Sequence, residues 1–265
     1  MSVLRLGLAC ALLAAICTVP ASASDNNNMT GHDLAVKMDE VDNSTDSYSA
    51  GRMKIVRGSK TLTRSFELFT KQMKPNKEEE HVLFLFHEPA DVKGTIYLEW
   101  TYSGLDKEDD LWVYLPSENL VRRLSGSSLY SSFMRSDFAN EDLQNLDDVE
   151  EYTYDLIGSE VVNGIDCYIL DRMPKAGKDT QYSKHRQWVR KDNYLRYKME
   201  FYDKKGKLIK TTYFDECAKI DGVWTNTKNR VVRADGKSTT YVDWTDIRYN
   251  IGLKDERFDH SQLRR

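Results

Sequence analysis

The sequence predicts a mainly β protein of the α+β class, with about ten or eleven antiparallel strands in one long meander and a helix near the N-terminus. Runs rich in Val, Ile, Thr, Tyr, Phe and Trp, interrupted by short polar turns, fill most of the 265 residues. The composition is 40% apolar and 11% aromatic with only 5 Pro. These values are typical of a globular protein and exclude disordered, collagen-like and coiled-coil chains.

Residues 1–23 are typical of a cleavable export signal. Met1 to Arg5 is positively charged, residues 6–19 are an apolar run, and Ala21-Ser22-Ala23 is the small-residue pattern that a signal peptidase reads. The run is shorter than the roughly 20 residues of a membrane span, so a membrane anchor is the less favoured alternative. We expect a signal peptide over residues 1–23, one soluble domain over residues 24–265 and a periplasmic protein.

One helix is predicted over about residues 31–43, where Thr30 can cap the N-terminus. Its apolar residues recur at helical spacing on one face: Leu34, Met38 and Val41. A weaker helical pattern covers residues 138–146. Two strands, residues 81–87 and 111–115, are apolar on both faces and need a cover. We expect the helix at residues 31–43 to pack against one of them.

Polar turns, most with a central glycine, separate the strands. Strands joined by such tight turns are antiparallel neighbours. A meander of this length must curl into a barrel or half-barrel, because strand twist accumulates across a wide sheet. One face then becomes an interior, and in residues 195–202 the apolar residues alternate with polar ones as this requires. The turns lie at residues 57–60, 163–164, 205–206, 221–222 and 235–236.

No catalytic or metal-binding motif is present. The chain lacks Gly-x-Ser-x-Gly, Cys-x-x-Cys and His-Glu-x-x-His. His81 and His87 lie about 20 Å apart along one strand, so they cannot bind one metal ion, and we expect them at strand ends facing water. Two acidic clusters, residues 107–110 and 141–151, lack the spacing of a calcium loop and are expected to be solvated. We therefore predict no catalytic residue, no metal and no cofactor.

The charge balance bears on the partner. Lys and Arg number 38 against 42 Asp and Glu, for a net charge of -4. Without a basic excess, nucleic acid is not expected to bind.

Two of the four cysteines, Cys167 and Cys217, follow the signal peptide. Export would expose them to an oxidising compartment, so a disulfide between them and a pair of free thiols both stay open. Pairing would require the curled sheet to bring two separated strands within about 7 Å.

A Ser-rich loop around residues 125–143 carries three large apolar side chains: Phe133, Met134 and Phe138. A purely structural loop avoids exposing such side chains, which favours a ligand-facing loop. The alternative is that the three side chains plug the open edge of the barrel.

Several motifs occur in a fixed order along the chain: Pro89-Ala-Asp-Val-Lys-Gly94, Leu111-Trp-Val-Tyr-Leu-Pro116, Arg122-Arg123, Phe133-Met-Arg-Ser-Asp-Phe138 and Glu141-Asp-Leu143. This series resembles the LolA-like family of outer-membrane lipoprotein-sorting proteins over nearly the whole chain after the signal peptide. Arg135 departs from the family, which usually has glycine there; glycine accepts a positive φ and arginine resists it. The residues of this chain that match the family motif are Pro116, Arg122, Arg123, Ser136, Asp137 and Asp142.

The resemblance implies a half-barrel of antiparallel strands around a hydrophobic cavity, with helices as its lid, as in LolA and LolB. It implies a carrier of a lipid or of lipoprotein acyl chains across the periplasm, and an inner-membrane exporter of the resistance-nodulation-division type as partner. An apolar interior suits such a ligand, because binding then depends on apolar area removed from water. From strand parity and the loop we expect this ligand-binding lining: Phe84, Phe86, Trp112, Tyr114, Phe133, Met134, Phe138, Tyr197, Met199 and Phe201.

Three functions stay open at this point. The first is the periplasmic carrier. The second is a lipid-processing hydrolase that uses a serine with one of the 5 histidines; substitution of His81, His87, His185 or Ser136 tests it. The third is a structural or assembly accessory of an envelope transport complex, with a filled barrel and no cargo.

The signal peptide predicts that the mature chain begins at Ser24. N-terminal sequencing of protein from the periplasmic fraction checks this. A stable full-length form embedded in the membrane would contradict it.

Overall fold

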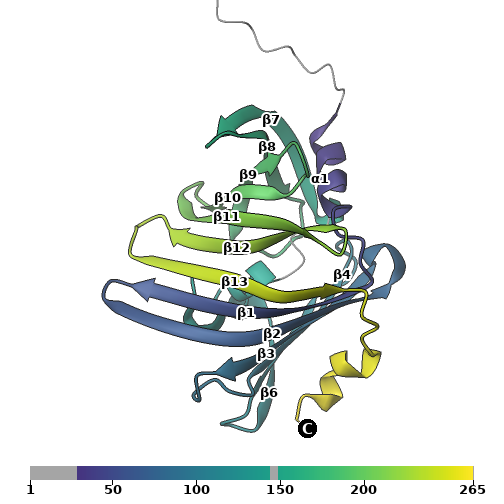
Figure 1. The fold of residues 1–265 in the computed structure, drawn as a ribbon, viewed down its shortest axis with the longest axis vertical. Helices are drawn as coiled ribbons and strands as arrows, with labels where there is room; N and C mark the ends of the chain where they lie inside the picture. The colour runs from purple at the N-terminus through teal and green to yellow at the C-terminus, as the bar shows by residue number, and fades with distance from the viewer. Residues whose placement is uncertain (1–28, 144–148, 265) are drawn as a thin grey trace, which may run out of the picture.

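The computed structural model describes residues 29–143 and 149–264. The predicted signal peptide, residues 144–146 of the weaker predicted helix and the acidic Asp147 and Asp148 lie outside these ranges. The described chain forms one curled, open antiparallel sheet with a single α-helix (Figure 1). The mainly β prediction is confirmed.

The sheet has 13 strands, more than the ten or eleven predicted. One reason for the low count is that the edge strand β6 spans only 5 residues, too few for a clear alternating pattern. The strands are β1 (Asp46–Arg57), β2 (Lys60–Lys74), β3 (Glu79–Glu88), β4 (Ile96–Tyr102), β5 (Asp110–Leu115), β6 (Leu120–Leu124), β7 (Tyr152–Val162), β8 (Ile165–Pro174), β9 (Tyr182–Arg190), β10 (Arg196–Asp203), β11 (Leu208–Ile220), β12 (Val223–Arg233) and β13 (Ser238–Tyr249).

The strand order is β6-β5-β4-β3-β2-β1-β13-β12-β11-β10-β9-β8-β7. The chain therefore forms two meanders rather than the single one predicted, and they join where β1 pairs with β13 in antiparallel fashion. The two edge strands, β6 and β7, are consecutive in sequence. Their connection must cross from one edge of the sheet to the other, and this crossing positions the candidate site.

The predicted tight turns are confirmed between consecutive strands. Asn163 and Gly164 have positive φ angles of 50° and 81° between β7 and β8, as a two-residue hairpin turn requires. The turns at residues 57–60, 205–206, 221–222 and 235–236 likewise each join neighbouring antiparallel strands.

Helix α1 (Gly31–Asp39) begins at the predicted cap but ends before residue 43. The side chain of Thr30 accepts a hydrogen bond from the Asp33 N–H, and the Asp33 carboxylate accepts one from the Thr30 N–H. This reciprocal capping box satisfies two backbone donors of the first turn. Val41 follows the helix, so it is not part of the helical face.

The expectation that α1 packs against β3 or β5 is wrong. Leu34 and Met38 are buried against Leu170 of β8 and Val189 of β9, at the opposite end of the sheet from β3 and β5 (Figure 1). The helix immediately precedes β1, yet it packs beside β7 because the curl brings that edge over the inside of the sheet.

The C-terminal segment supplies the missing cover on the outside of β3, β4 and β5. Two short 3-10 helices, η6 (Asp255–Phe258) and η7 (His260–Gln262), follow β13 and bury Phe258 and Leu263 against the sheet. The Trp100 indole N–H donates to the Phe258 carbonyl over 2.9 Å. The outer layer is therefore made by the end of the chain and not by the N-terminal helix.

Two backbone contacts explain why glycine occurs inside regular elements. A Cβ atom at Gly31 would lie 2.6 Å from the carbonyl oxygen of Tyr154, because α1 meets β7 backbone to backbone there. A Cβ at Gly51 of β1 would lie 2.3 Å from the ring of Phe66, which folds across that strand.

We predict that Gly31→Ala destabilises the fold by about 1–3 kcal/mol, because the obstructing atoms belong to a strand backbone that cannot move away cheaply. Urea unfolding measures the loss. The exposed neighbour His32→Ala is the control and should change little. An unchanged or higher midpoint for Gly31→Ala would show that α1 does not dock this closely.

Candidate functional site

The inner face of the sheet is defined by cross-strand pairs that share a side. Phe84 pairs with Leu68 on β2 and with Tyr97 on β4, and Tyr97 pairs with Val113 on β5. Cross-strand partners point to the same side of a sheet. This continuous row and its neighbours make an apolar wall over β1 to β5.

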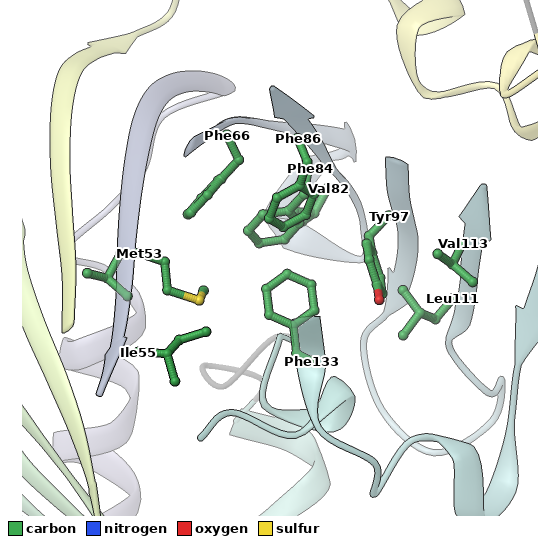
Figure 2. Close-up of a cluster of buried hydrophobic side chains, with 11 residues drawn as sticks. Met53, Ile55, Phe66, Val82, Phe84, Phe86, Tyr97, Leu111, Val113 and Phe133 are labelled. Carbon is green, nitrogen blue, oxygen red and sulfur yellow. The ribbon is translucent and has the colours of Figure 1, made fainter. Parts of the chain in front are cut away.

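Phe133 lies at the centre of that wall although it belongs to a loop. Its ring centroid is 4.8 Å from that of Tyr97, 5.5 Å from that of Phe84 and 5.7 Å from that of Phe86. Figure 2 shows the ring entering from below, between Met53 and Ile55 on one side and the β4 and β5 side chains on the other. Phe133 is only 1% exposed. It fills the interior.

Residues 125–143 are the first described part of the connection from β6 to β7 and are here called the crossing loop. The second described part is the short 3-10 helix η5 (Val149–Glu151). The crossing loop contains three 3-10 helices, η2 (Gly126–Ser128), η3 (Phe133–Arg135) and η4 (Asn140–Leu143). Met134 and Phe138 are partly buried against the same apolar wall. In this conformation the three apolar side chains of the loop occupy the interior, as in the plug alternative.

Two motif carboxylates fasten the crossing loop to the sheet. The Asp137 carboxylate accepts hydrogen bonds from the hydroxyls of Ser238 (2.9 Å) and Thr240 (2.7 Å) on β13. The Asp142 carboxylate accepts one from the Tyr182 hydroxyl (2.7 Å) and forms an ion pair with Lys210 of β11. Asp137 and Asp142 of the family motif therefore anchor the loop, and both are buried.

For Glu141, Asp142 and Glu151, this burial corrects the expectation that the acidic cluster at residues 141–151 is solvated. Glu141 and Asp142 are each 8% exposed and Glu151 is 7% exposed. Burial raises the pKa of Glu141, and burial together with the Asp142 charge raises the pKa of Tyr182. The Tyr182 hydroxyl consequently stays protonated and donates to Asp142. A charge count in sequence cannot show that Lys210 lies opposite, 68 residues away.

The inner face over β8 to β11 combines charged and apolar side chains, whereas that over β1 to β5 is mainly apolar. Arg172, His185, Phe201 and Lys210 are cross-strand partners in one row. The Arg172 guanidinium lies 3.9 Å above the Tyr152 ring and its Nη2 is 3.1 Å from Nδ1 of His185. Burial and the neighbouring Arg172 charge hold the pKa of His185 well below its usual range, so this histidine is neutral.

Glu99 of β4 is a buried acid in the apolar wall. It is 1% exposed, its cross-strand partners are Val82 and Leu111, and neither carboxyl oxygen has a hydrogen-bond partner within the described residues. Burial raises its pKa well above the usual value of 4.5, so the carboxyl group is protonated at neutral pH.

The comparisons with known proteins are consistent with this geometry. A family model described as "Uncharacterized protein" matches residues 78–265. A DUF1329 family protein from Desulfovibrio piger is 57% identical, with a TM-score of 0.86 over 88% of this chain and 97% of that chain. A Vibrio parahaemolyticus domain assigned to outer membrane lipoprotein sorting is 29% identical, with a TM-score of 0.82 over 89% and 98%. The chain belongs to the DUF1329 family, and its fold is LolA-like.

A LolA superfamily protein from Nitrosomonas europaea shares the fold, with a TM-score of 0.70 at 22% identity over 88% of this chain and 99% of that one. No curated protein sequence matches the chain. These likenesses confirm the resemblance to LolA-like proteins at the level of the fold.

The structure separates the ten expected lining residues into three groups. Phe84, Phe86, Met199 and Phe201 face the inside and are buried, together with the loop residue Phe133 and its partly buried neighbours Met134 and Phe138. Tyr197 is half-buried, and its hydroxyl accepts a hydrogen bond from Asn163 in the β7–β8 turn.

Trp112 and Tyr114 face the opposite side of the sheet. They pack in the outer cluster under η6 and η7, where the Trp112 ring stacks on His260 at 5.3 Å. By strand parity they lie on the same face of the sheet as Leu98, and Leu111 and Val113 lie on the other face. The expectation that they line the interior is wrong, because both faces of β5 are apolar and the pattern alone does not orient the strand.

The other motif residues lie outside the interior or serve the loop. Arg122 and Arg123 are exposed and pair with Glu118 and Asp110, and Pro116 lies beside Gly94. The Ser136 hydroxyl accepts a hydrogen bond from the Phe138 N–H. Arg135 keeps a positive φ of 63°, which explains why glycine is usual in the family at this position.

Cys167 and Cys217 are free thiols on β8 and β11, two strands that β9 and β10 separate. Cys167 is fully buried, which raises its pKa to about 11. The structure therefore contains the unpaired form of the two alternatives.

His81 corrects a further expectation, since it is 5% exposed and stacks on Trp100 at 4.6 Å instead of facing water. Within residues 29–143 and 149–264, no three His, Cys, Asp or Glu side chains gather as a metal site. No helix in these ranges is long and apolar enough to cross a membrane.

Sequence reasoning missed most of the polar inner face. The charged and polar side chains of an amphipathic strand are expected on its solvent face, yet these are buried: Arg64, Glu99, Arg172, His185 and Gln187. Strand parity is the signal that points to them. Arg64, for example, lies two residues before Phe66 and therefore on the same side of β2.

We predict that Asp142→Asn destabilises the protein by about 3 kcal/mol, because Lys210 is left buried without its counter-ion. Thermal or urea unfolding gives the difference. The matched control is Asp192→Asn, which breaks an exposed pair with Arg190 and should cost at most about 1 kcal/mol. Equal effects would show that the loop anchor is not formed.

Glu99 gives a pH-dependent prediction. Its folded pKa is raised, so the stability due to its neutral form is fully present below the unfolded pKa of about 4.5 and is lost as the pH rises toward the folded pKa. Glu99→Gln stays neutral throughout. We expect it to be more stable than wild type by about 1–3 kcal/mol at pH 8 and nearly equal at pH 4. Unfolding curves at both pH values check this, with the exposed Glu118→Gln as control; a difference that does not change with pH contradicts it.

Proposed function

We propose that this protein is a periplasmic carrier that binds a lipid, or the acyl chains of a lipoprotein, between the apolar wall over β1 to β5 and the crossing loop. The observation that carries the proposal is the position of Phe133. A curled sheet encloses an apolar volume that its own strands do not fill, and a side chain from a separate segment occupies it. A ligand chain that took this place would bury a comparable apolar surface.

Loading then requires Phe133, Met134 and Phe138 to leave the wall. The loop is held by hydrogen bonds to Asp137 and by the ion pair of Asp142. Its apolar side chains contribute contact area that an acyl chain can replace. Exchange of one apolar occupant for another costs little net free energy. The expected cavity is, in this proposal, the space that the loop vacates.

The filled interior also favours a second candidate. A structural or assembly accessory with no cargo would have the same buried Phe133. The two candidates differ in whether purified protein contains or binds lipid. For a carrier, we further propose an inner-membrane exporter of the resistance-nodulation-division type as the partner, on the strength of the family resemblance.

The test measures two quantities: the lipid that the purified protein already contains, and the affinity of the protein for an added lipid. Solvent extraction of the purified protein followed by mass spectrometry should recover lipid in stoichiometric amount, and a fluorescent fatty acid should bind. Phe84→Asn, on the inner wall, should weaken binding about ten- to a hundredfold, as expected for a polar group worth about 1–3 kcal/mol in an apolar site.

The matched control is Trp112→Asn on the outer face, which should leave the affinity unchanged. Thermal melts establish that both variants fold. No extracted lipid and no binding by wild type would reject the carrier in favour of the accessory, and equal losses in both variants would reject the inner wall as the site.

A further inference from the structure

Arg64 of β2 is a buried cation without an acidic partner. It is 3% exposed. Its Nη1 donates to the backbone carbonyl of the adjacent Thr63 at 2.8 Å, and its Nε is buried with no hydrogen-bond acceptor. Within the described chain no carboxylate pairs with it. Burial of a charged group is costly unless it is paired. This side chain therefore lacks a hydrogen-bond acceptor or an anion that would offset the cost.

The other buried cations of the inner face are satisfied differently. Lys210 forms an ion pair with Asp142. Arg172 lies over the Tyr152 ring and contacts His185. Arg64 alone of the three is set in the apolar half of the sheet without such a partner in the residues described.

Arg64 points into the same interior that Phe133 fills. It pairs with Met53 on β1, and Phe66 follows it two residues later on the same face; both belong to the cluster around Phe133. The apolar wall continues along β2 from Arg64 to Leu68, about 13 Å at the rise of a strand. Arg64 therefore places a cation within an apolar face, between Leu62 on one side and Phe66 on the other. The part of this face from Arg64 to Leu68 is long enough to contact an acyl chain.

From this arrangement we propose that the ligand is an amphiphile with an anionic, oxygen-bearing head group, and that Arg64 binds this head group while the acyl chain lies along Phe66 and Leu68. The inference rests on the carrier function proposed above and adds the class of ligand. A guanidinium group can donate two parallel hydrogen bonds to a carboxylate or a phosphate, which are the two head-group chemistries that fit.

The same arrangement predicts opposite effects of Arg64 on stability and binding. A structural arginine stabilises the fold, so its replacement lowers the melting temperature. An arginine kept for a ligand leaves the empty protein with an uncompensated buried charge, so its replacement by an apolar side chain of similar length should leave the melting temperature unchanged or higher.

The experiment compares matched ligands that differ only in head-group charge. A fluorescent fatty acid and its methyl ester are titrated into wild type, Arg64→Met and Arg52→Met; Arg52 is an exposed arginine on β1 and serves as the control. We expect wild type and Arg52→Met to bind the acid at least tenfold more tightly than the ester. Arg64→Met should bind the acid at least tenfold more weakly than wild type does, while its affinity for the ester should be unchanged.

A second pair, lysophosphatidate against a neutral monoacylglycerol, repeats the comparison by displacement of the probe. A preference for either acidic lipid that depends on Arg64 supports the inference, and the tighter of the two identifies carboxylate or phosphate as the head group.

Three outcomes overturn the inference. Equal affinity of wild type for charged and neutral ligands removes the head-group site but leaves the carrier. A lower melting temperature or failure to fold in Arg64→Met assigns the arginine a structural role. Absence of binding to any of the four lipids removes the carrier proposal, and this inference with it.

Discussion

The structure depends on how the concave face of a curled sheet is covered. Thirteen strands in two meanders leave β6 and β7 at opposite edges, so the chain between them has to cross the interior. Asp137 bonds that crossing loop to Ser238 and Thr240 on β13, and Asp142 bonds it to Lys210 on β11. These anchors place Phe133 against the apolar wall. Without them the apolar wall over β1 to β5 would face solvent, and soluble monomers rarely expose large apolar patches.

The contacts of Asp137 and Asp142 are harder to replace than the apolar contacts of Phe133, and this difference suits a carrier. A buried ion pair and several hydrogen bonds to a carboxylate fix the loop's position, and losing one partner is expensive. Aromatic contacts of Phe133 with Tyr97 and Phe84 are non-directional apolar packing that another apolar group can replace.

Much of the fold could be predicted from the sequence, because turns and alternation are local. Asn163-Gly164 and the four other turns predict five of the twelve strand pairs, and Thr30 predicts the start of α1. The order of the strands could not be predicted, since nothing local says that β13 returns to β1. Likewise, Trp112 and Val113 lie on a strand that is apolar on both faces. Parity shows that they face opposite sides of the sheet, but it does not show which side is the interior. The loop was identified by Phe133, Met134 and Phe138, whereas its anchors depend on Lys210 and Thr240, which are distant in sequence and ordinary in composition.

Hydrogen exchange of the crossing loop tests most directly whether the loop and a ligand share one site. The Phe133 N–H donates to the Phe138 carbonyl and the Ser136 N–H to the Phe133 carbonyl, so these amides are protected while the loop is closed. Upon saturation with a fatty acid, the account predicts faster exchange for peptides covering residues 133–138 and no change for β10 and β11. Unchanged or slower exchange in residues 133–138 with ligand bound would contradict it.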